Sequence, residues 1–301
     1  MKILKAADNR EVIFCSEDSV TIRQIEEAEI IIGNLPVSML PKAEKLKWLQ
    51  LNSAGVDAYC KKGVLKEKVI LTNASGAYDI SVAENMVAAT MALMKQLYIY
   101  HDNQRQHIWR DEGRVLSAHG SCVLVLGLGN IGLNYARKMK AMGCYIIGIR
   151  KHIGAAVEGV DEVYTIDKLD DCLSRADIVA AVLPGTDETK GLLDRNRFAI
   201  MKKTAYLINM GRGNVVNSND LCQALIEGKI AGALLDVTDP EPLPDEHPLW
   251  DAPGLYITPH VAGGFHIPIT LEMVADICAM NLTNYLNHTP LINVIDRKEG
   301  Y

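Results

Sequence analysis

Three glycines are spaced so that they could hold a phosphate group against the backbone. The segment Gly127-Leu128-Gly129-Asn130-Ile131-Gly132 follows the apolar run Cys122–Leu126 and precedes a stretch with helical spacing. In such a strand–turn–helix setting Gly127 permits a tight turn, Gly129 lets a pyrophosphate approach, and Gly132 lets helix and strand pack closely. The helix N-terminus offers free N–H groups to the same anion. The segment therefore predicts a dinucleotide site, although glycines also gather in turns that bind no ligand.

Two basic residues follow the next expected strand, Tyr145–Ile149. That strand should end beside the adenosine ribose, where an acidic residue usually accepts hydrogen bonds from the hydroxyl groups of NAD. Arg150 and Lys151 stand there instead, and such a pair can bind a 2′-phosphate through charge-assisted hydrogen bonds. The sequence therefore favours NADPH over NADH. The alternative is that Arg150 is a solvated surface residue and that the site accepts both cofactors.

Alternating strands and helices must position these groups. Short β-branched runs alternate with helical patterns along nearly the whole chain, which predicts an α/β fold with doubly wound parallel sheets. The expected elements before the glycine segment are strands at Glu11–Cys15, Glu29–Gly33, Trp48–Asn52 and Val69–Thr72 and a long helix at Ser81–Arg105. We expect residues 1–93 and 271–301 to form a discontinuous outer domain that binds substrate. Residues 94–270 would form the dinucleotide-binding domain.

Composition excludes several classes of protein. The 301 residues suggest two domains, and 49% hydrophobic with 23% charged residues is typical of a globular protein. A net charge of -6 argues against a broad nucleic-acid or anionic-membrane surface. Seven scattered cysteines without a C-x-x-C pair favour reduced thiols over disulfides or a zinc site, so no metal is expected. No signal peptide or uncharged run of about 20 residues is evident, which predicts a cytoplasmic protein.

Further motifs occur in a characteristic order along nearly the whole chain. Around the glycine segment they are Asn52-Ser53-Ala54-Gly55-Val56-Asp57, Asn73-Ala74-Ser75-Gly76, Val182-Leu183-Pro184 with Glu188-Thr189, Asn209-Met210-Gly211-Arg212-Gly213, Leu235-Asp236-Val237 with Glu241-Pro242, and Thr258-Pro259-His260. In this order the chain resembles the D-isomer-specific 2-hydroxyacid dehydrogenases, including glyoxylate/hydroxypyruvate reductases. The resemblance implies two Rossmann-like domains with the cofactor cleft between them.

The resemblance implies a catalytic set of Arg212, Glu241 and His260. A 2-oxo acid has a carboxylate to hold and a carbonyl oxygen that must gain a proton as hydride reaches the carbon. The guanidinium of Arg212 can bind both groups. His260 would be the general acid in reduction and the general base in oxidation, and Glu241 would favour its imidazolium form. Backbone N–H groups of Ser53-Ala54-Gly55 would complete the carboxylate site.

The same resemblance assigns residues to the cofactor. They are Gly127, Gly129, Asn130, Ile131, Gly132, Arg150, Lys151, Leu183, Pro184, Thr189, Met210, Asp236 and Gly263. Asp236 would face the nicotinamide carboxamide, and the alternative is that it caps a buried loop. A homodimer through the cofactor domain is also implied. We thus expect an enzyme that reduces a small 2-oxo acid to a D-2-hydroxy acid with NADPH.

Departures from the family pattern leave the substrate open. Thr238 stands where an aromatic residue is common, Asp79-Ile80-Ser81 replaces a small, Pro-containing run, and Glu84-Asn85 replaces Glu-His. Two alternatives remain. One is a non-catalytic nucleotide-sensing scaffold, because transcriptional corepressors resemble this family. The other is a formate-type dehydrogenase of the same fold, but those enzymes carry Gln where this chain has Glu241.

Overall fold

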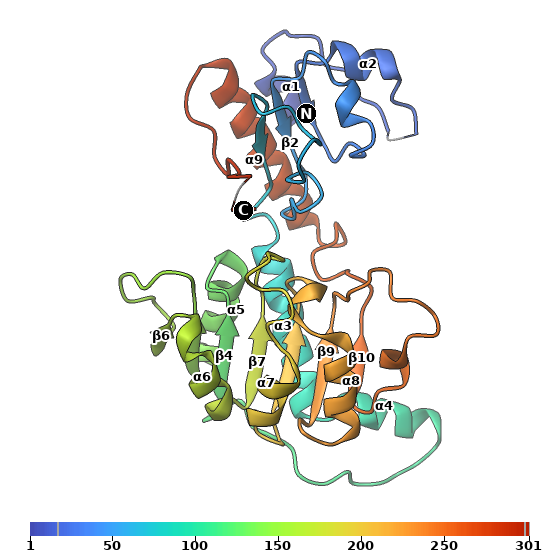
Figure 1. Ribbon diagram of the computed structural model, residues 1–301, viewed down its shortest axis with the longest axis vertical. Coiled ribbons are helices and arrows are strands. Elements are labelled where there is room, and N and C mark those ends of the chain that lie inside the picture. The colour runs from blue at the N-terminus through green and yellow to red at the C-terminus, as the bar shows by residue number, and fades with distance from the viewer. Residues whose placement is uncertain (17, 298, 301) are drawn as a thin grey trace. The chain divides into compact units, whose positions relative to one another are not determined.

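The computed structural model describes residues 1–16, 18–297 and 299–300, and the chain divides into two compact units. The smaller unit comprises Met1–Tyr78 and Phe265–Tyr301, and the larger unit comprises Asp79–Gly264 (Figure 1). The boundaries expected from the sequence, at residues 93 and 270, fall later along the chain. The reason for the first difference is that helix α3 (Asp79–Met94) packs against α5 (Asn130–Ala141). There the buried hydroxyl groups of Thr90 and Tyr135 share a hydrogen bond of 2.7 Å.

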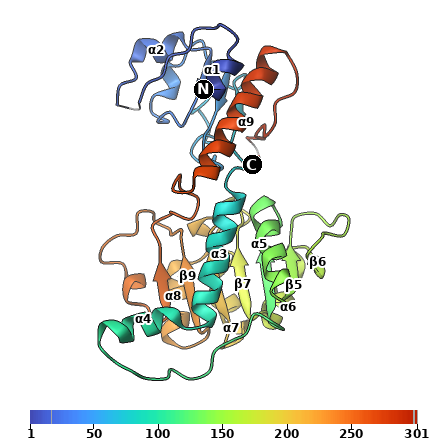
Figure 2. The ribbon, with the colours of Figure 1, turned by 180° about the vertical axis from the view of Figure 1, so that it is seen from behind.

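A seven-stranded parallel sheet forms the centre of the larger unit. Its strand order is β10-β9-β8-β7-β4-β5-β6. The strands are β4 (Cys122–Leu126), β5 (Tyr145–Ile149), β6 (Glu162–Tyr164), β7 (Ile178–Ala181), β8 (Tyr206–Asn209), β9 (Gly232–Leu235) and β10 (Leu255–Ile257). Helices α3 and α5 cover one face, as Figure 2 shows, and α6 (Leu169–Arg175), α7 (Arg195–Ile200) and α8 (Ser218–Ile226) cover the other. The central strands are apolar and fully buried because both faces are covered.

The order in which the chain adds strands to this parallel sheet reverses between β4 and β7. From β4 the chain builds β5 and β6 on one side and then returns to build β7 to β10 on the other. Ligands of doubly wound sheets bind beyond the carboxyl ends of the strands at such a reversal. The loop after β4 is the glycine segment, so the topology places that segment at this position.

The smaller unit contains a three-stranded parallel sheet in the order β1-β2-β3. The strands are β1 (Ile30–Ile32), β2 (Trp48–Gln50) and β3 (Ile70–Thr72), and the helices are α1 (Lys2–Ala6), α2 (Ile22–Glu27) and α9 (Pro268–Leu286). On one face Trp48 stacks on Tyr285 of α9 with ring centroids 5.2 Å apart. On the other face Leu49 and Leu71 pack with Ile25 of α2. Helices thus cover both faces, which confirms the doubly wound arrangement.

Two expected elements need correction. The strand expected at Glu11–Cys15 is absent from the described residues 11–16, where the side chains of Ile13 and Phe14 are more than half exposed and pack into no core. The long helix Ser81–Arg105 is two helices, α3 and α4 (Leu97–Arg105), because Gln96 takes a left-handed φ of 57°. Across the described part of the chain no helix is both long and apolar enough to cross a membrane.

Candidate active site

The turn after β4 has no room for side chains at two of its glycines. Gly127 has a φ of +101°, and a Cβ on it would lie 2.9 Å from the carbonyl oxygen of Val182 at the end of β7. A Cβ on Gly132 would lie 1.9 Å from the carbonyl oxygen of Gly127. The turn is therefore closed by backbone packing between β4, β7 and α5.

The third glycine of the turn faces open space. Gly129 precedes the first residue of α5, and a Cβ on it would meet no heavy atom within 4 Å. The N–H groups of Asn130, Ile131 and Gly132 have no acceptor in the described part of the chain. An open backbone and free N–H groups at a helix N-terminus fit the pyrophosphate of a dinucleotide.

Basic side chains follow β5. The Nε atom of Arg150 is buried and has no hydrogen-bond partner among the described residues. Lys151 Nζ lies 3.6 Å from Glu188 Oε2 in the loop after β7. A Cβ on Gly154 would lie 2.4 Å from Arg150 Nη2, so the guanidinium packs closely over the backbone of this glycine. An orphaned guanidinium nitrogen, with a lysine as the next residue of the chain, fits an additional anion.

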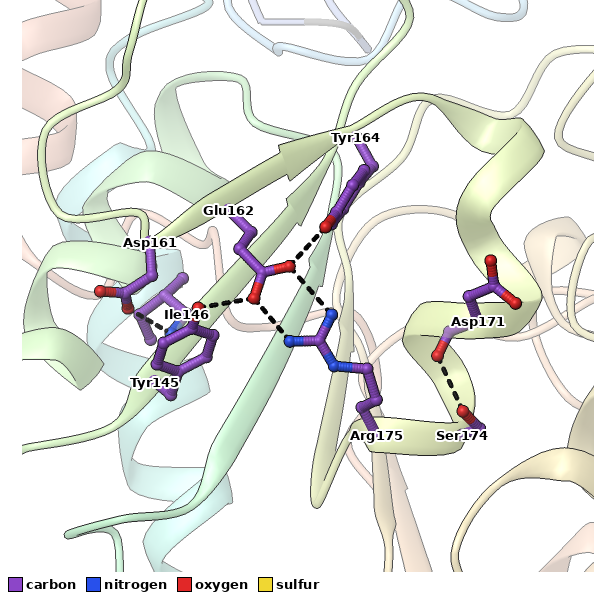
Figure 3. A network of polar contacts seen from close by, with 8 residues as sticks. All are labelled: Tyr145, Ile146, Asp161, Glu162, Tyr164, Asp171, Ser174 and Arg175. Atoms are coloured by element: carbon purple, nitrogen blue, oxygen red, sulfur yellow. Dashed lines mark hydrogen bonds and ion pairs between the residues drawn. The ribbon is translucent and has the colours of Figure 1, made fainter.

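Glu162 of β6 is the centre of a polar network (Figure 3). Glu162 accepts hydrogen bonds from Tyr145 at 2.5 Å and Tyr164 at 2.6 Å and forms two with Arg175 at 2.5 and 2.9 Å. Arg175 and both tyrosines lower the pKa of Glu162 to about 2. Since the N–H of Arg150 donates to the carbonyl of Tyr164 at 3.0 Å, the network fixes the backbone from which Arg150 projects.

The remaining cofactor candidates lie in neighbouring loops. Leu183 lies beside the glycine turn, since a Cβ on Gly127 would come within 3.3 Å of its side chain. Thr189 donates to the carbonyl of Pro184 at 2.6 Å and thereby closes the loop after β7. Met210 follows β8, is buried, and donates its N–H to Ala181 at 3.1 Å. Gly263 lies three residues beyond His260.

Arg212 follows β8 on a backbone wedged between two other loops. A Cβ on Gly213 would lie 2.0 Å from the carbonyl oxygen of Thr238, and one on Gly211 would lie 2.7 Å from that of Leu183. The side chain of Asn209 donates to the carbonyl of Arg212 at 2.9 Å. Close backbone packing therefore fixes the backbone at the arginine, and its guanidinium also donates a hydrogen bond from Nη1 to the carbonyl of Gly211 at 2.9 Å.

Glu241 and His260 come together at the carboxyl ends of β9 and β10. His260 Nδ1 lies 2.5 Å from Glu241 Oε1, and both side chains are about half exposed, at 49% and 42%. His260 takes a left-handed φ of 52°, which is rare for a residue with a Cβ. Its N–H donates to the carbonyl of Asp236 at 2.8 Å, so a strained backbone is fixed at the histidine.

Asp236 organises the turn that carries His260. Its side chain is buried and accepts hydrogen bonds from Thr258 Oγ1 at 2.6 Å, Val261 N at 3.0 Å and Ala262 N at 3.0 Å. Asp236 thus caps a buried loop, which is the alternative to a role at the nicotinamide. A contact between Asp236 and the nicotinamide remains a prediction.

The candidate carboxylate-binding loop, Ser53-Ala54-Gly55, follows β2 in the smaller unit. Its three carbonyl groups accept hydrogen bonds from Ala74 N at 2.9 Å, Asn73 Nδ2 at 2.7 Å and Ser53 Oγ at 2.9 Å, respectively. Its three N–H groups have no acceptor in the described part of the chain. The loop is thus held by its carbonyls and keeps its donors available for an anion.

Local sequence patterns do not identify the properties of two further side chains, Glu188 and Asp79. Glu188 belongs to the Glu188-Thr189 motif, but nothing in the neighbouring sequence shows that its side chain contacts Lys151 from another loop. Asp79, the first residue of α3, is a half-buried carboxyl group whose pKa burial raises to about 6. Only its departure from the family pattern draws attention to it.

Comparisons with known proteins agree with this geometry. Residues 87–262 match the family model described as "D-isomer specific 2-hydroxyacid dehydrogenase, NAD binding domain". A family protein from Aeromonas salmonicida is 34% identical, with a TM-score of 0.87 over 98% of this chain and 94% of that chain. An NADPH-dependent glyoxylate/hydroxypyruvate reductase from Sinorhizobium meliloti, solved with NADP and sulfate, is 27% identical, with a TM-score of 0.87 over 100% and 96%. Glyoxylate/hydroxypyruvate reductase A from Photorhabdus laumondii is 31% identical over 88% of this chain and 85% of its own length.

Proposed function

Because this chain belongs to the D-isomer-specific 2-hydroxyacid dehydrogenase family and is an NAD(P)-dependent oxidoreductase, we propose that it reduces a small 2-oxo acid to the D-2-hydroxy acid and prefers NADPH. The observation that carries the proposal is the His260–Glu241 pair, 2.5 Å apart, at the same sheet edge as the glycine turn. A positioned acid–base group is the component that reduction of a carbonyl requires from the protein.

The cofactor residues have separate tasks in this proposal. The bound nicotinamide supplies the hydride. The free N–H groups at the start of α5 bind the pyrophosphate, and Arg150 and Lys151 bind the ribose 2′-phosphate. The preference for NADPH is supported by the orphaned Nε of Arg150, which a phosphate oxygen would satisfy. The Sinorhizobium meliloti relative is likewise named as NADPH-dependent.

His260 moves the proton in this proposal. Glu241 occupies the Nδ1 side of the ring at 2.5 Å, which leaves Nε2 to donate to the carbonyl oxygen in reduction and to accept the proton in oxidation. Glu241 therefore fixes the orientation of the ring. Arg212 binds the substrate carboxylate through its planar guanidinium and polarises the carbonyl. Ser53-Ala54-Gly55 contribute N–H donors to the same carboxylate, which is supported by the free state of those groups.

The substrate we propose is a small 2-oxo acid such as glyoxylate or hydroxypyruvate. Two relatives named for these acids support this choice. Thr238, which replaces a common aromatic residue, is 9% exposed, and its hydroxyl donates to the carbonyl of Pro240 at 2.8 Å. That side chain thus stabilises the loop leading to Glu241.

We also propose a homodimer formed through the larger unit. The loop after α4 is the support for this proposal, because Trp109 is fully exposed there and Ile108 is more than one-third exposed. Contiguous exposed apolar surface is typical of protein–protein contacts. Light scattering on the purified protein should give twice the mass of the 33.1 kDa chain. A monomer at micromolar concentration would exclude it.

An absorbance assay at 340 nm tests the proposed reaction. Purified protein is mixed with NADPH or NADH and a panel from glyoxylate through hydroxypyruvate to phenylpyruvate, with formate oxidation as a separate assay. We expect faster oxidation of NADPH than NADH and a D-configured product from hydroxypyruvate. An L product, or activity with formate alone, would overturn the proposal.

A further inference from the structure

An ion pair links the two loops that flank the glycine turn. Lys151 stands two residues beyond the end of β5, and Glu188 lies in the loop after β7. Strands β5 and β7 are the two neighbours of β4 in the sheet. The 3.6 Å contact between Lys151 Nζ and Glu188 Oε2 therefore spans the end of β4. It brings an acidic side chain to the basic turn.

The cations of this turn differ in what they already contact. Lys151 has a carboxylate partner in Glu188, whereas the buried Nε of Arg150 has none among the described residues. The side chain of Glu188 is 73% exposed, so water solvates it and it can move away from Lys151 at little cost. The pair is thus a contact that a stronger anion can replace.

We propose that Glu188 is a specificity-determining residue, whose carboxylate competes with the ribose 2′-phosphate for Lys151 and so limits the preference for NADPH over NADH. This inference rests on the proposed role of Arg150 and Lys151 in binding that phosphate.

The two cofactors differ in whether they displace Glu188 from Lys151. NADH carries a neutral 2′-hydroxyl group, so Lys151 keeps its contact with Glu188 when this cofactor binds. The 2′-phosphate of NADPH must take Lys151 from Glu188 and also meets a like charge at short range. Removing the carboxylate therefore strengthens binding of the phosphorylated cofactor alone. Since both partners are solvent-exposed, the effect is modest and weakens with salt.

Calorimetry with cofactor fragments tests this inference independently of turnover. The probes are adenosine 2′,5′-bisphosphate, which carries the 2′-phosphate, and 5′-AMP, which lacks it. Glu188→Gln should bind the bisphosphate about two- to fivefold more tightly and leave 5′-AMP unchanged. The gain should shrink between 20 mM and 500 mM salt, as screening requires. Asp187→Asn is the matched control, because it removes the same charge one residue away and should alter neither affinity.

Variants of the basic residues separate the two proposals. Arg150→Met and Lys151→Met should each weaken the bisphosphate and spare 5′-AMP. Glu188→Gln should add no affinity in the Lys151→Met background, because the competition requires the ammonium group. Suppose that the basic variants weaken only the bisphosphate but Glu188→Gln binds both probes as tightly as the parent. The inference about Glu188 is then wrong, and the proposed 2′-phosphate site is retained. If the basic variants leave the bisphosphate unchanged, the proposed NADPH preference fails.

Discussion

At the β6 flank of the larger sheet, Glu162 accepts hydrogen bonds from Tyr145, Tyr164 and Arg175 (Figure 3). At the carboxyl edge of the same sheet, the buried Nε of Arg150 and the first N–H groups of α5 have no partner in the described part of the chain. The two regions share one sheet and are both rich in polar groups. They differ in whether the protein itself satisfies those groups.

The difference separates groups that stabilise the fold from groups kept for a ligand. An unsatisfied buried polar atom costs about 1–3 kcal/mol, which a purely structural region would avoid. The left-handed backbone of His260 adds strain at the same edge. Unsatisfied polar groups and backbone strain of this kind are expected at functional sites. Changes at the carboxyl edge should therefore act on binding and turnover, and changes at the flank should act on stability.

Arg212→Met should greatly reduce turnover at the carboxyl edge. A charge-assisted contact with the substrate carboxylate is worth several kcal/mol, so kcat/KM should fall by about 10²–10³-fold. The melting temperature should stay near that of the parent, because backbone packing holds this position. Steady-state kinetics and thermal unfolding measure the two effects. A large loss of stability with normal kinetics would place Arg212 with the structural groups.

Two glycines of the same turn should respond differently to one methyl group. Gly132→Ala would place a Cβ 1.9 Å from a carbonyl oxygen, so it should destabilise the larger unit by about 1–3 kcal/mol or more. Gly129→Ala meets no protein atom and should leave stability unchanged, but it should weaken nucleotide binding where the pyrophosphate approaches. Denaturant unfolding and nucleotide titration distinguish them. Equal loss of stability in both variants would contradict the open face at Gly129.

Glu162→Gln should lower stability at neutral pH by about 1–3 kcal/mol without changing kcat. The folded pKa of Glu162 is about 2, below its usual 4.5. Its contribution is thus present above pH 4.5 and lost as pH falls toward 2. Urea unfolding across this pH range should show that the difference in free energy of unfolding between the parent and the variant becomes smaller as the pH falls. A difference that is the same at pH 7 and pH 3 would show that the charge of Glu162 is not its source.

Asp79→Asn should give the smallest effect and the opposite sign. Burial raises the pKa of Asp79 to about 6, so the folded protein favours the protonated form. The associated stability is present below pH 3.8 and lost as pH rises through 6. The amide variant should therefore be more stable than the parent at pH 8, by less than about 1 kcal/mol because water screens a half-exposed group. Denaturant unfolding of the variant and the parent at pH 4 and pH 8 checks this prediction. If the two proteins were equally stable at both pH values, the prediction would be contradicted.

Local patterns in the sequence predict much of this molecule. Buried apolar strands such as Cys122–Leu126 and the glycine segment carry their structural reason within a few residues, and the structure has both as expected. It also places Glu241 within hydrogen-bond distance of His260, as their predicted pairing requires.

Features that depend on tertiary contacts were not accessible in the same way. The apolar residues at Glu11–Cys15 suggest a strand, but no sheet edge among the described residues pairs with them. The unit boundary at Asp79 depends on which neighbours α3 packs against. The contact of Glu188 with Lys151 and the hydrogen bond from the backbone N–H of Val261 to Asp236 join groups from different loops. The sheet order determines which of these loops lie close together.

Turnover and nucleotide binding by His260→Ala test the central claim most directly. The account predicts that NADPH oxidation with the preferred 2-oxo acid falls by about 10²–10⁴-fold, the usual contribution of positioned acid–base catalysis. NADPH should still quench tryptophan fluorescence with the affinity of the parent, since His260 lies outside the proposed phosphate contacts. Parent-like turnover in this variant would contradict the assignment of His260 as the proton donor.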